Sequence, residues 1–267
     1  MAANDQDLSI SVITGASSGI GRELARVAAE RGSDVVIVSD GDDIHTAAAE
    51  LAGTGRQVIP VQADLATKGG VDLLYERVRE LGRPVDALFA NAGRGLANGF
   101  LDQNPAEIQN VIDVNVSGTV YLLHRFVSDM RQQGWGRVLI TGSIAGLMPG
   151  TYNAVYNASK AFVNSFAYAL RHELAHTGVT ITVLMPGATD TDFFESAGLL
   201  DTKLGTNDKD DPATVARAGY DAMLRGDGHE VSGFGNKLQA MMTRVLSDDT
   251  LAKMHEGMAR PGSARHH

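Results

Sequence analysis

The chain has 267 residues, of which 43% are hydrophobic, and a formal charge of -9 at neutral pH. This length and apolar content suit an α/β domain with a buried sheet. The acidic balance argues against nucleic acid or an anionic membrane as a partner, and the absence of cysteine excludes disulfides, thiol catalysis and zinc–thiolate sites.

The N-terminal residues and the hydropathy pattern bear on location. Residues 1–7 are polar and acidic, unlike a signal peptide, and no apolar run approaches the ~20 residues of a membrane span. We therefore expect a cytoplasmic protein without a membrane partner. No linker, repeat or low-complexity run divides the chain, so we expect residues 1–267 to form a single domain.

The first expected unit is a strand over residues 8–14, a glycine-rich turn and a helix over residues 20–31. Gly15, Gly19 and Gly21 have a Gly-x-x-x-Gly-x-Gly spacing, looser than the usual dinucleotide fingerprint. Small residues let the backbone turn tightly and approach a pyrophosphate at a helix N-terminus, where free amides favour anions. A purely structural turn is the alternative, but the strand before it and the helix after it favour a nucleotide site.

A second strand is expected over residues 34–39, where the apolar run ends in Ser39 and Asp40. An acid about 20 residues past the glycines can bond a ribose 2′-hydroxyl. No Arg or Lys follows closely, which favours NAD over NADP. Alternatively, Asp40 caps the next helix, which we expect to begin near Asp43.

The third and fourth strands are expected over residues 57–61 and 85–90. Asp64 and Leu65 follow the third, where Asp64 could simply cap the helix expected over residues 67–81. The fourth strand is apolar after Asp86, as in a buried parallel sheet.

A long helix is expected over residues 105–133, with Pro at its start and Gly134 after its end. Asn115 lies within it and could be no more than an exposed polar residue. Residues 136–141 predict the fifth strand, and Ser143 follows it at the carboxyl end, where open α/β sheets place their sites.

Residues 154–174 predict a helix that carries Tyr156 and Lys160 on one face, one turn apart. A neighbouring ammonium favours the phenolate and lowers the pKa of a Tyr, so this pair is a plausible acid/base unit. Taken alone, the pair is more often a core Tyr beside a solvated Lys, because short motifs recur by chance.

The sixth strand is expected over residues 179–184, and strands and helices alternate up to this point. This alternation predicts a Rossmann-type fold, a doubly wound parallel sheet with helices on both faces. Residues 230–233 are the only candidate for a seventh strand. Beyond them, residues 234–260 predict an amphipathic helical extension that packs on the body, covers the site or contacts another subunit.

These motifs together resemble the short-chain dehydrogenase/reductase family over residues 8–191. The resemblance rests on residues 14–21, Asn91-Ala92-Gly93, Asn115, Ser143, the Tyr156/Lys160 pair and Pro186-Gly187. It implies an NAD(P)-dependent oxidoreductase that acts on a ketone or secondary alcohol. The different-class alternative is a catalytically silent nucleotide-binding sensor or scaffold with the same fold.

The resemblance also implies residue roles. Tyr156 would be the acid/base, Lys160 would lower its pKa and bond the nicotinamide ribose, Ser143 would bond the substrate oxygen, and Asn115 would hold a relay water. Asp64 would meet the adenine. The expected cofactor contacts are Gly15, Ser17, Ser18, Gly19, Ile20, Gly21, Ser39, Asp40, Asp64, Leu65, Asn91, Ala92, Gly93, Tyr156, Lys160, Pro186, Gly187, Thr189 and Thr191.

The substrate pocket is expected between residues 94–99, residues 144–152 and a lid over residues 192–211, with Phe193, Phe194, Leu199 and Leu200 as apolar contacts. Family members commonly pair the two long helices across a two-fold axis. We therefore expect a homodimer, or a homotetramer if the C-terminal edge also docks.

A metal site is not expected. His172 and His176 match the zincin pattern His-Glu-x-x-His. No third ligand is evident, and the motif ends the helix that carries Tyr156. A His near a helix C-terminus also has a simple electrostatic rationale.

Overall fold

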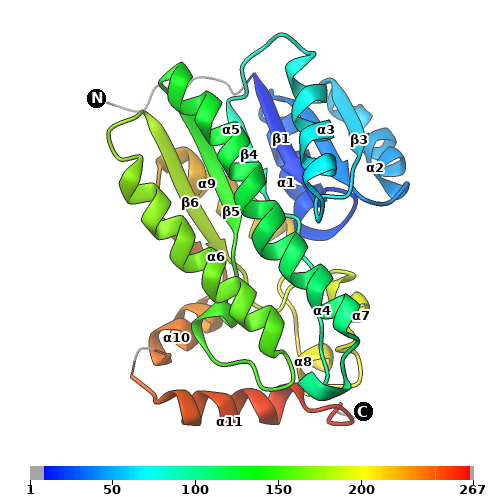
Figure 1. Cartoon of the computed structure of the whole chain (residues 1–267), viewed down its shortest axis with the longest axis vertical. Helices are drawn as coiled ribbons and strands as arrows, with labels where there is room; N and C mark the ends of the chain where they lie inside the picture. The colour runs from blue at the N-terminus through cyan, green and yellow to red at the C-terminus, as the bar shows by residue number, and fades with distance from the viewer. Residues whose placement is uncertain (1–8, 244, 265–267) are drawn as a thin grey trace.

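The computed structural model describes residues 9–243 and 245–264, so residues 1–8, including the expected strand residue Leu8, lie outside the described part. The core is one sheet of seven parallel strands in the order β3-β2-β1-β4-β5-β6-β7 (Figure 1). The strands are β1 (Ile10–Thr14), β2 (Asp34–Ser39), β3 (Val58–Gln62), β4 (Ala87–Ala90), β5 (Gly136–Thr141), β6 (Val179–Met185) and β7 (His229–Val231). The doubly wound parallel sheet predicted from the sequence is thereby confirmed.

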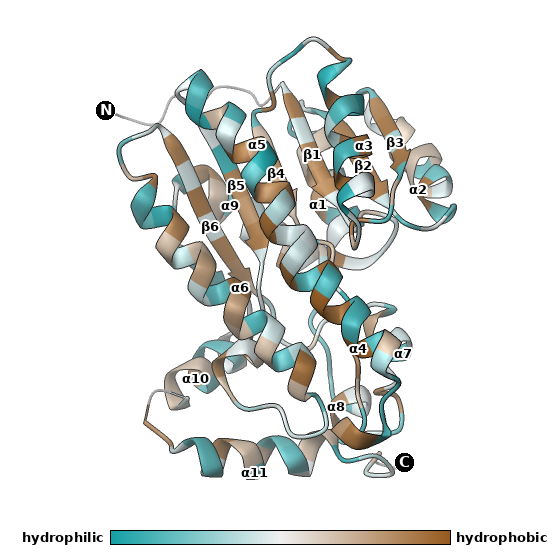
Figure 2. Cartoon of the chain, viewed as in Figure 1, coloured by the Kyte–Doolittle hydropathy of each residue, from teal (hydrophilic) through white to brown (hydrophobic). Residues whose placement is uncertain are grey.

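Helices cover both faces of the sheet. One face carries α1 (Gly19–Glu30), α2 (Asp43–Leu51) and α9 (Pro212–Arg225), whereas the other carries α3 (Lys68–Arg79), α4 (Pro105–Ile112), α5 (Thr119–Gln133) and α6 (Ala154–Glu173) (Figure 1). The strands between them are apolar along most of their length (Figure 2). A strand buried on both faces needs such a continuous apolar run, because neither side of it meets water.

The helix expected over residues 105–133 is in fact three segments. A π-helical turn, η3 (Asp113–Gly118), separates α4 from α5. Gly118 allows this turn to approach the loop after β3, since a Cβ there would lie 2.0 Å from the carbonyl oxygen of Leu65. π-Turns inside α-helices are frequently found at functional sites, and this one contains Asn115.

Helix α9 was not predicted from the sequence. Asp211 caps it by accepting from the amides of Ala213 and Thr214, and Pro212 occupies its first turn. Its Tyr220 stacks on Phe89 of β4, with ring centroids 5.9 Å apart. The helix therefore completes the apolar cover of one face of the sheet.

The helices that do not cover the sheet gather beyond the carboxyl ends of the strands (Figure 1). They include η4 (Ile144–Leu147), α7 (Phe193–Ser196), α8 (Lys203–Thr206), α10 (Phe234–Met242) and α11 (Asp248–Ala259); η1 (Ala52–Thr54) and η2 (Phe100–Asp102) lie in other loops. The apolar side chains of α10 do not pack on the body as expected, because Leu238 and Met241 are 54% and 67% exposed. Among the described residues, no helix combines the length and the hydropathy that crossing a bilayer requires.

Candidate active site

A cavity of about 670 Å³ opens at the carboxyl ends of the strands. This volume falls within the ~300–1,000 Å³ typical of small-molecule sites. All of the predicted site residues line the cavity except Asn115, which lies behind its wall. The sheet therefore brings together residues that are far apart in the sequence.

The glycine-rich turn forms the floor of the cavity. Gly15 and Gly19 have φ angles of +62° and +54°, which residues other than glycine rarely adopt. A Cβ on Gly15 would lie 2.9 Å from Cα of Ala92, so the turn and the loop after β4 touch directly. Ser18 forms no side-chain cap on α1, which leaves the first amides of the helix without a side-chain acceptor. This arrangement fits a pyrophosphate.

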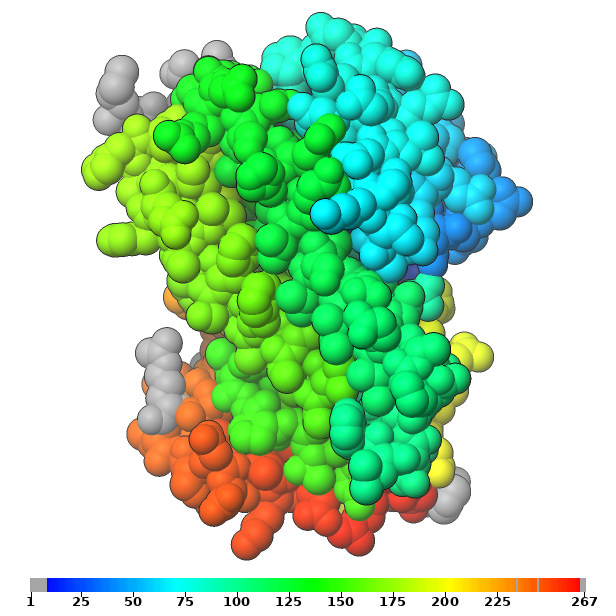
Figure 3. All heavy atoms as spheres, viewed as in Figure 1, coloured from blue at the N-terminus to red at the C-terminus, as the bar shows by residue number. Residues whose placement is uncertain are grey.

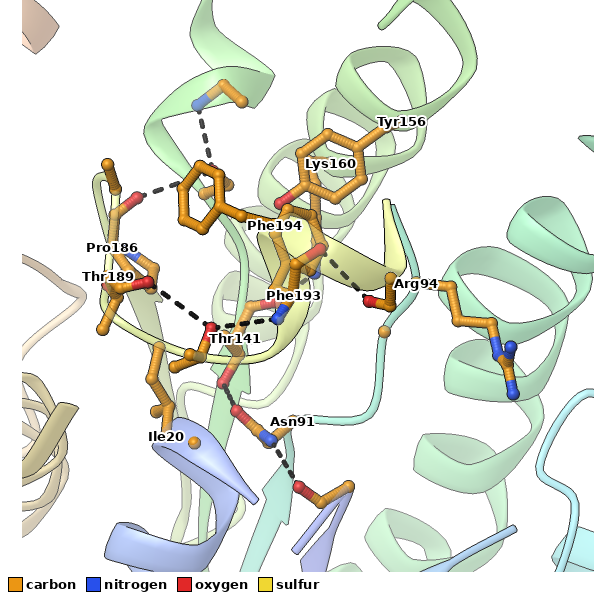
Figure 4. Close-up of a pocket in the computed structure, with 18 of the residues that line it drawn as sticks. Ile20, Asn91, Arg94, Thr141, Tyr156, Lys160, Pro186, Thr189, Phe193 and Phe194 are labelled. Atoms are coloured by element: carbon orange, nitrogen blue, oxygen red, sulfur yellow. Dashed lines mark hydrogen bonds between the residues drawn. The ribbon is translucent and has the colours of Figure 1, made fainter. Parts of the chain in front are cut away.

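Asn91 holds the ends of three strands together. Its Nδ2 donates to the carbonyl oxygens of Thr14 (3.1 Å) and Gly15 (3.3 Å), and its Oδ1 accepts from the hydroxyl of Thr141 (3.0 Å) (Figure 4). The Thr14 hydroxyl in turn accepts from the amides of Asn91 and Ala92, both at 2.9 Å. Asn91 thus positions the glycine-rich turn.

Tyr156 and Ser143 both line the cavity and are hydrogen-bonded to each other. Burial raises the pKa of Tyr156 to about 12, and a hydrogen bond with the Ser143 hydroxyl lowers it only in part. In the chain without ligands, loss of hydration on burial is therefore the largest effect on the pKa of this phenol, and the lowering expected from Lys160 stays a prediction. The phenol is protonated at neutral pH and is ready to act as an acid.

Lys160 belongs to a row of three α6 residues that hold the loop after β5. Its Nζ donates to the carbonyl oxygen of Thr141 at 2.9 Å. One turn to either side, Asn157 donates to the carbonyl of Ala145 (2.9 Å) and Asn164 to the carbonyl of Ser143 (3.0 Å). Residues 157, 160 and 164 share one face of the helix, so α6 fixes the backbone that carries Ser143.

The Lys160 ammonium is buried and lies 6.0 Å from the centroid of the Tyr156 ring. Burial lowers its pKa from 10.5 to about 8. It remains mostly charged at neutral pH, and its charge is desolvated at the place where a phenolate would form.

Asn115 is committed to protein partners. Its Oδ1 accepts from the amide of Arg94 (2.8 Å), and its Nδ2 donates to the carbonyl of Arg94 and the hydroxyl of Ser159, both at 2.9 Å. The Gly93 backbone lies between it and the ammonium, since a Cβ on Gly93 would lie 3.3 Å from Asn115 Oδ1 and 3.2 Å from Lys160 Nζ. Asn115 therefore positions the loop after β4.

The end of β2 carries more charge than the sequence suggested. Asp40 forms an ion pair with Arg94, which reaches across from the loop after β4. The Ser39 hydroxyl donates to Asp43 at 3.3 Å, and Asp43 also lines the cavity. Asp40 does not cap α2, because Asp42 occupies the capping position.

Asp64 does not cap α3 either. Thr67 caps that helix by accepting from the amide of Gly70 at 3.0 Å. The Asp64 carboxylate accepts from the amide of Ala66 (2.9 Å) and is exposed at the edge of the cavity. It is therefore available to a ligand.

The expected lid is ordered over the cavity. The ring of Phe193 lies 5.1 Å from that of Tyr156, and a Cβ on Gly95 would meet it at 2.5 Å (Figure 4). Phe194 and Leu199 are buried in a small apolar cluster with Ala97, whereas Leu200 is 54% exposed and is not an apolar contact of the pocket. The lid thus places an aromatic wall beside the phenol.

Thr191, at the start of this lid, touches the glycine-rich turn. A Cβ on Gly19 would lie 2.7 Å from its Cγ2. A Cβ on Gly187 would lie 2.2 Å from Oδ1 of Asn236 in α10, so these two residues are in close contact. The segment from residue 186 to 191 therefore forms one wall of the cavity between the turn and the C-terminal helices.

His172 lies in the last turn of α6 and His176 in the turn that follows the helix; both are exposed and away from the cavity. Across residues 9–243 and 245–264, no three or more histidine, aspartate or glutamate side chains converge as metal ligands would.

Sequence reasoning missed several residues that line the cavity. The missed residues are Asp43, Asn153, Asn157, Asn236, Gln239, His255 and Met258. The last four come from the C-terminal extension, and only its amphipathic pattern hinted at a role over the site.

Comparisons with known proteins agree with this geometry. Residues 9–199 match the sequence pattern of the short chain dehydrogenase family. An uncharacterized oxidoreductase of Staphylococcus epidermidis is 32% identical over 186 residues, which cover 70% of this chain and 80% of that protein.

Two solved structures are similar in fold. A short-chain dehydrogenase of Sphingobium yanoikuyae in complex with NADPH is 27% identical, with a TM-score of 0.77, and the match covers 90% of this chain and 97% of that one. A short chain dehydrogenase/reductase of Burkholderia phymatum in complex with NAD has a TM-score of 0.81 at 24% identity, over 88% of this chain and 92% of that one, which supports the fold alone.

Proposed function

Because the chain belongs to the short-chain dehydrogenase family of oxidoreductases, we propose that it transfers a hydride between a nicotinamide dinucleotide and a ketone/secondary alcohol pair. The observation that carries the proposal is the convergence of Tyr156, Ser143 and Lys160 on one cavity that also contains a glycine-rich turn. The turn has the tight backbone and the free helix amides that a pyrophosphate needs.

The residues present fit such a cofactor. The glycine-rich turn would hold its pyrophosphate, the acids after β2 and β3 its adenosine end, and residues 186–191 its nicotinamide end. The similar short-chain dehydrogenase in complex with NADPH supports a nicotinamide dinucleotide. When bound, the dinucleotide would supply or accept the hydride.

The protein would move the proton. Tyr156, which is protonated at neutral pH, would donate its phenol proton to the oxygen of a ketone as that oxygen gains charge. Ser143 would donate a hydrogen bond to the same oxygen. The buried Lys160 ammonium would stabilise the phenolate that remains, with little screening by water. In the reverse direction Tyr156 would take the proton back.

We also propose that the chain prefers NAD to NADP. Three acids line the cavity where the adenosine would lie: Asp40, Asp43 and Asp64. Arg94 is a cation in their midst, and it is already paired with Asp40. A 2′-phosphate there would meet net negative charge.

Replacing Tyr156 by Phe tests the reaction. We expect Tyr156→Phe to lower kcat for ketone reduction by about 10²–10⁴-fold, the usual contribution of a positioned general acid, with dinucleotide affinity nearly unchanged. Tyr168→Phe on the exposed side of the same helix is the matched control. Steady-state kinetics on a panel of ketones and calorimetric titration of the dinucleotide measure both quantities. Near-normal kcat in Tyr156→Phe would overturn the mechanism.

A further inference from the structure

Helix α11 carries a buried histidine on its inner face. Leu251, His255 and Ala259 recur every four residues and are 2%, 4% and 0% exposed. A polar ring between two apolar residues on a buried face costs free energy unless its nitrogens find partners. This helix lies outside residues 9–199, the part of the chain that matches the family pattern.

One nitrogen of the ring has a partner. Nδ1 of His255 lies 2.8 Å from the carbonyl oxygen of Thr151. A carbonyl can only accept, so Nδ1 carries the proton in this tautomer. The Thr151 hydroxyl donates back to the carbonyl of Ala252 at 2.9 Å. This reciprocal pair clamps α11 to the loop before α6, and the two segments lie against each other at the base of the molecule (Figure 3).

The other nitrogen is left as an acceptor. Burial lowers the pKa of His255, so the ring is neutral at pH 7 and Nε2 presents a lone pair. Within residues 9–243 and 245–264, the structure contains no hydrogen bond to Nε2. His255 nevertheless lines the same cavity as Tyr156, together with Met258 from the next turn.

We propose that Nε2 of His255 accepts a hydrogen bond from the substrate, which would then be a ketone or secondary alcohol with a second hydroxyl group away from the reacting carbon. The inference rests on the proposed function of the site. An analogue without this hydroxyl would displace water from the cavity and leave Nε2 unpaired, so the site would discriminate against it.

Two variants separate this role from anchoring. In His255→Asn, the side-chain amide can take the place of Nδ1–H and still donate to Thr151, but nothing replaces Nε2. His255→Phe removes both groups. Lys253→Asn places the same amide on the exposed side of the same helix and is the control.

The probes are straight-chain methyl ketones that end in a hydroxyl, each paired with the ketone of equal length that ends in a methyl group. The chain length at which the hydroxyl is preferred indicates the distance between Tyr156 and His255. We expect the wild type and Lys253→Asn to favour the hydroxyl member of one pair by at least ~10-fold in kcat/KM. The ratio should fall to near unity in His255→Asn, while the melting temperature stays close to that of the wild type. If the ratio is unchanged in His255→Asn, and His255→Phe lowers kcat/KM equally for both ketones of a pair, His255 only anchors α11.

Binding distinguishes this outcome from failure of the proposed function. Each pair is titrated calorimetrically against the wild type and His255→Asn, with dinucleotide present. A chain that reduces none of the ketones refutes the proposed function. Equal binding of the hydroxyl and methyl members by the wild type, in every pair, refutes the role of His255 whether or not turnover occurs.

Discussion

The buried ammonium of Lys160 lowers the free energy of unfolding by an amount that depends on pH. Its pKa falls from 10.5 to about 8 on folding, because burial penalises the charged form. At ~1.4 kcal/mol per pH unit, the charged form costs about 3 kcal/mol of stability. The sign follows from proton binding: below pH 8 both states hold the proton and the cost is full. Between pH 8 and 10.5 only the unfolded state holds it, so stability rises with pH.

Lys160→Met should reveal this cost. The variant loses the hydrogen bond to the Thr141 carbonyl, a penalty that does not depend on pH. We expect its stability relative to the wild type to be most favourable at pH 7 and to decline by about 3 kcal/mol as the pH rises past 10. Urea unfolding of both chains at a series of pH values, without dinucleotide, measures the difference. A difference that stays constant across the range would mean that Lys160 is well solvated.

Residue types and spacing predicted that Tyr156 and Lys160 lie together at this site, but not which of the opposing effects on their pKa values is larger. Tyr156 and Lys160 share a helix face as expected, yet the pKa of the phenol is raised to about 12. Burial of the ring and of the ammonium depends on the loop after β5 and on Phe193, which are distant in sequence. The sign of a pKa change that results from opposing effects cannot be read from spacing alone.

At the scale of elements, the apolar strands were the most predictable feature. β1, β2, β4, β5 and β6 lie within or close to their expected ranges, because a buried parallel strand needs an uninterrupted apolar run. The π-turn at residues 113–118 has no such signature, since it depends on contact with Leu65. α9 could have been found from Asp211-Pro212 and Gly226, which are ordinary start and stop signals.

The link between the end of β2 and the loop after β4 was not visible in sequence either. Arg94 follows Gly93 and is distant from Asp40 along the chain, yet the two form an ion pair. Both side chains are about half exposed, at 52% and 51%, so the pair itself stabilises the fold little. The ion pair matters for dinucleotide binding instead, because the Arg94 guanidinium is already paired with Asp40.

Dinucleotide choice should therefore change when this link is cut. Asp40→Asn frees Arg94 and removes one acid, and we expect NADP(H) to bind about 10-fold more tightly, whereas NAD(H), which would lose a carboxylate partner for its ribose, gains nothing. Adding Arg94→Gln to that variant should abolish the gain. Calorimetric titration of both dinucleotides against the single and double variants measures the effect. Tighter binding of NADP(H) than of NAD(H) by the wild type would instead show that Arg94 already serves the phosphate.

At the scale of the whole molecule, the apolar surface is uneven. Leu123 and Val127 of α5, which share a helical stripe in the sequence, are buried against the sheet. On α6, by contrast, Phe162 is 43% exposed and stacks on Phe166 with ring centroids 5.9 Å apart. Large apolar side chains on an exposed helix face are costly in water and often mark a subunit contact.

We therefore predict a homodimer in which α6 meets its copy across a two-fold axis, which would bury Phe162 twice. A charge at such a position loses its hydration on assembly, so Phe162→Glu should give a monomer at micromolar concentration. Leu73→Glu on α3, where Leu73 is 47% exposed, is the matched control and should leave the molar mass unchanged.

Light scattering of the three proteins decides the assembly. A monomeric wild type, or a Phe162→Glu variant that remains dimeric, would remove α6 from the interface. A tetramer that falls to a dimer in Phe162→Glu would show a second contact. Two surfaces suited to it are the three-residue edge strand β7 and the face of α10 with the exposed Leu238 and Met241, because an edge strand and an uncovered apolar helix face both gain by pairing.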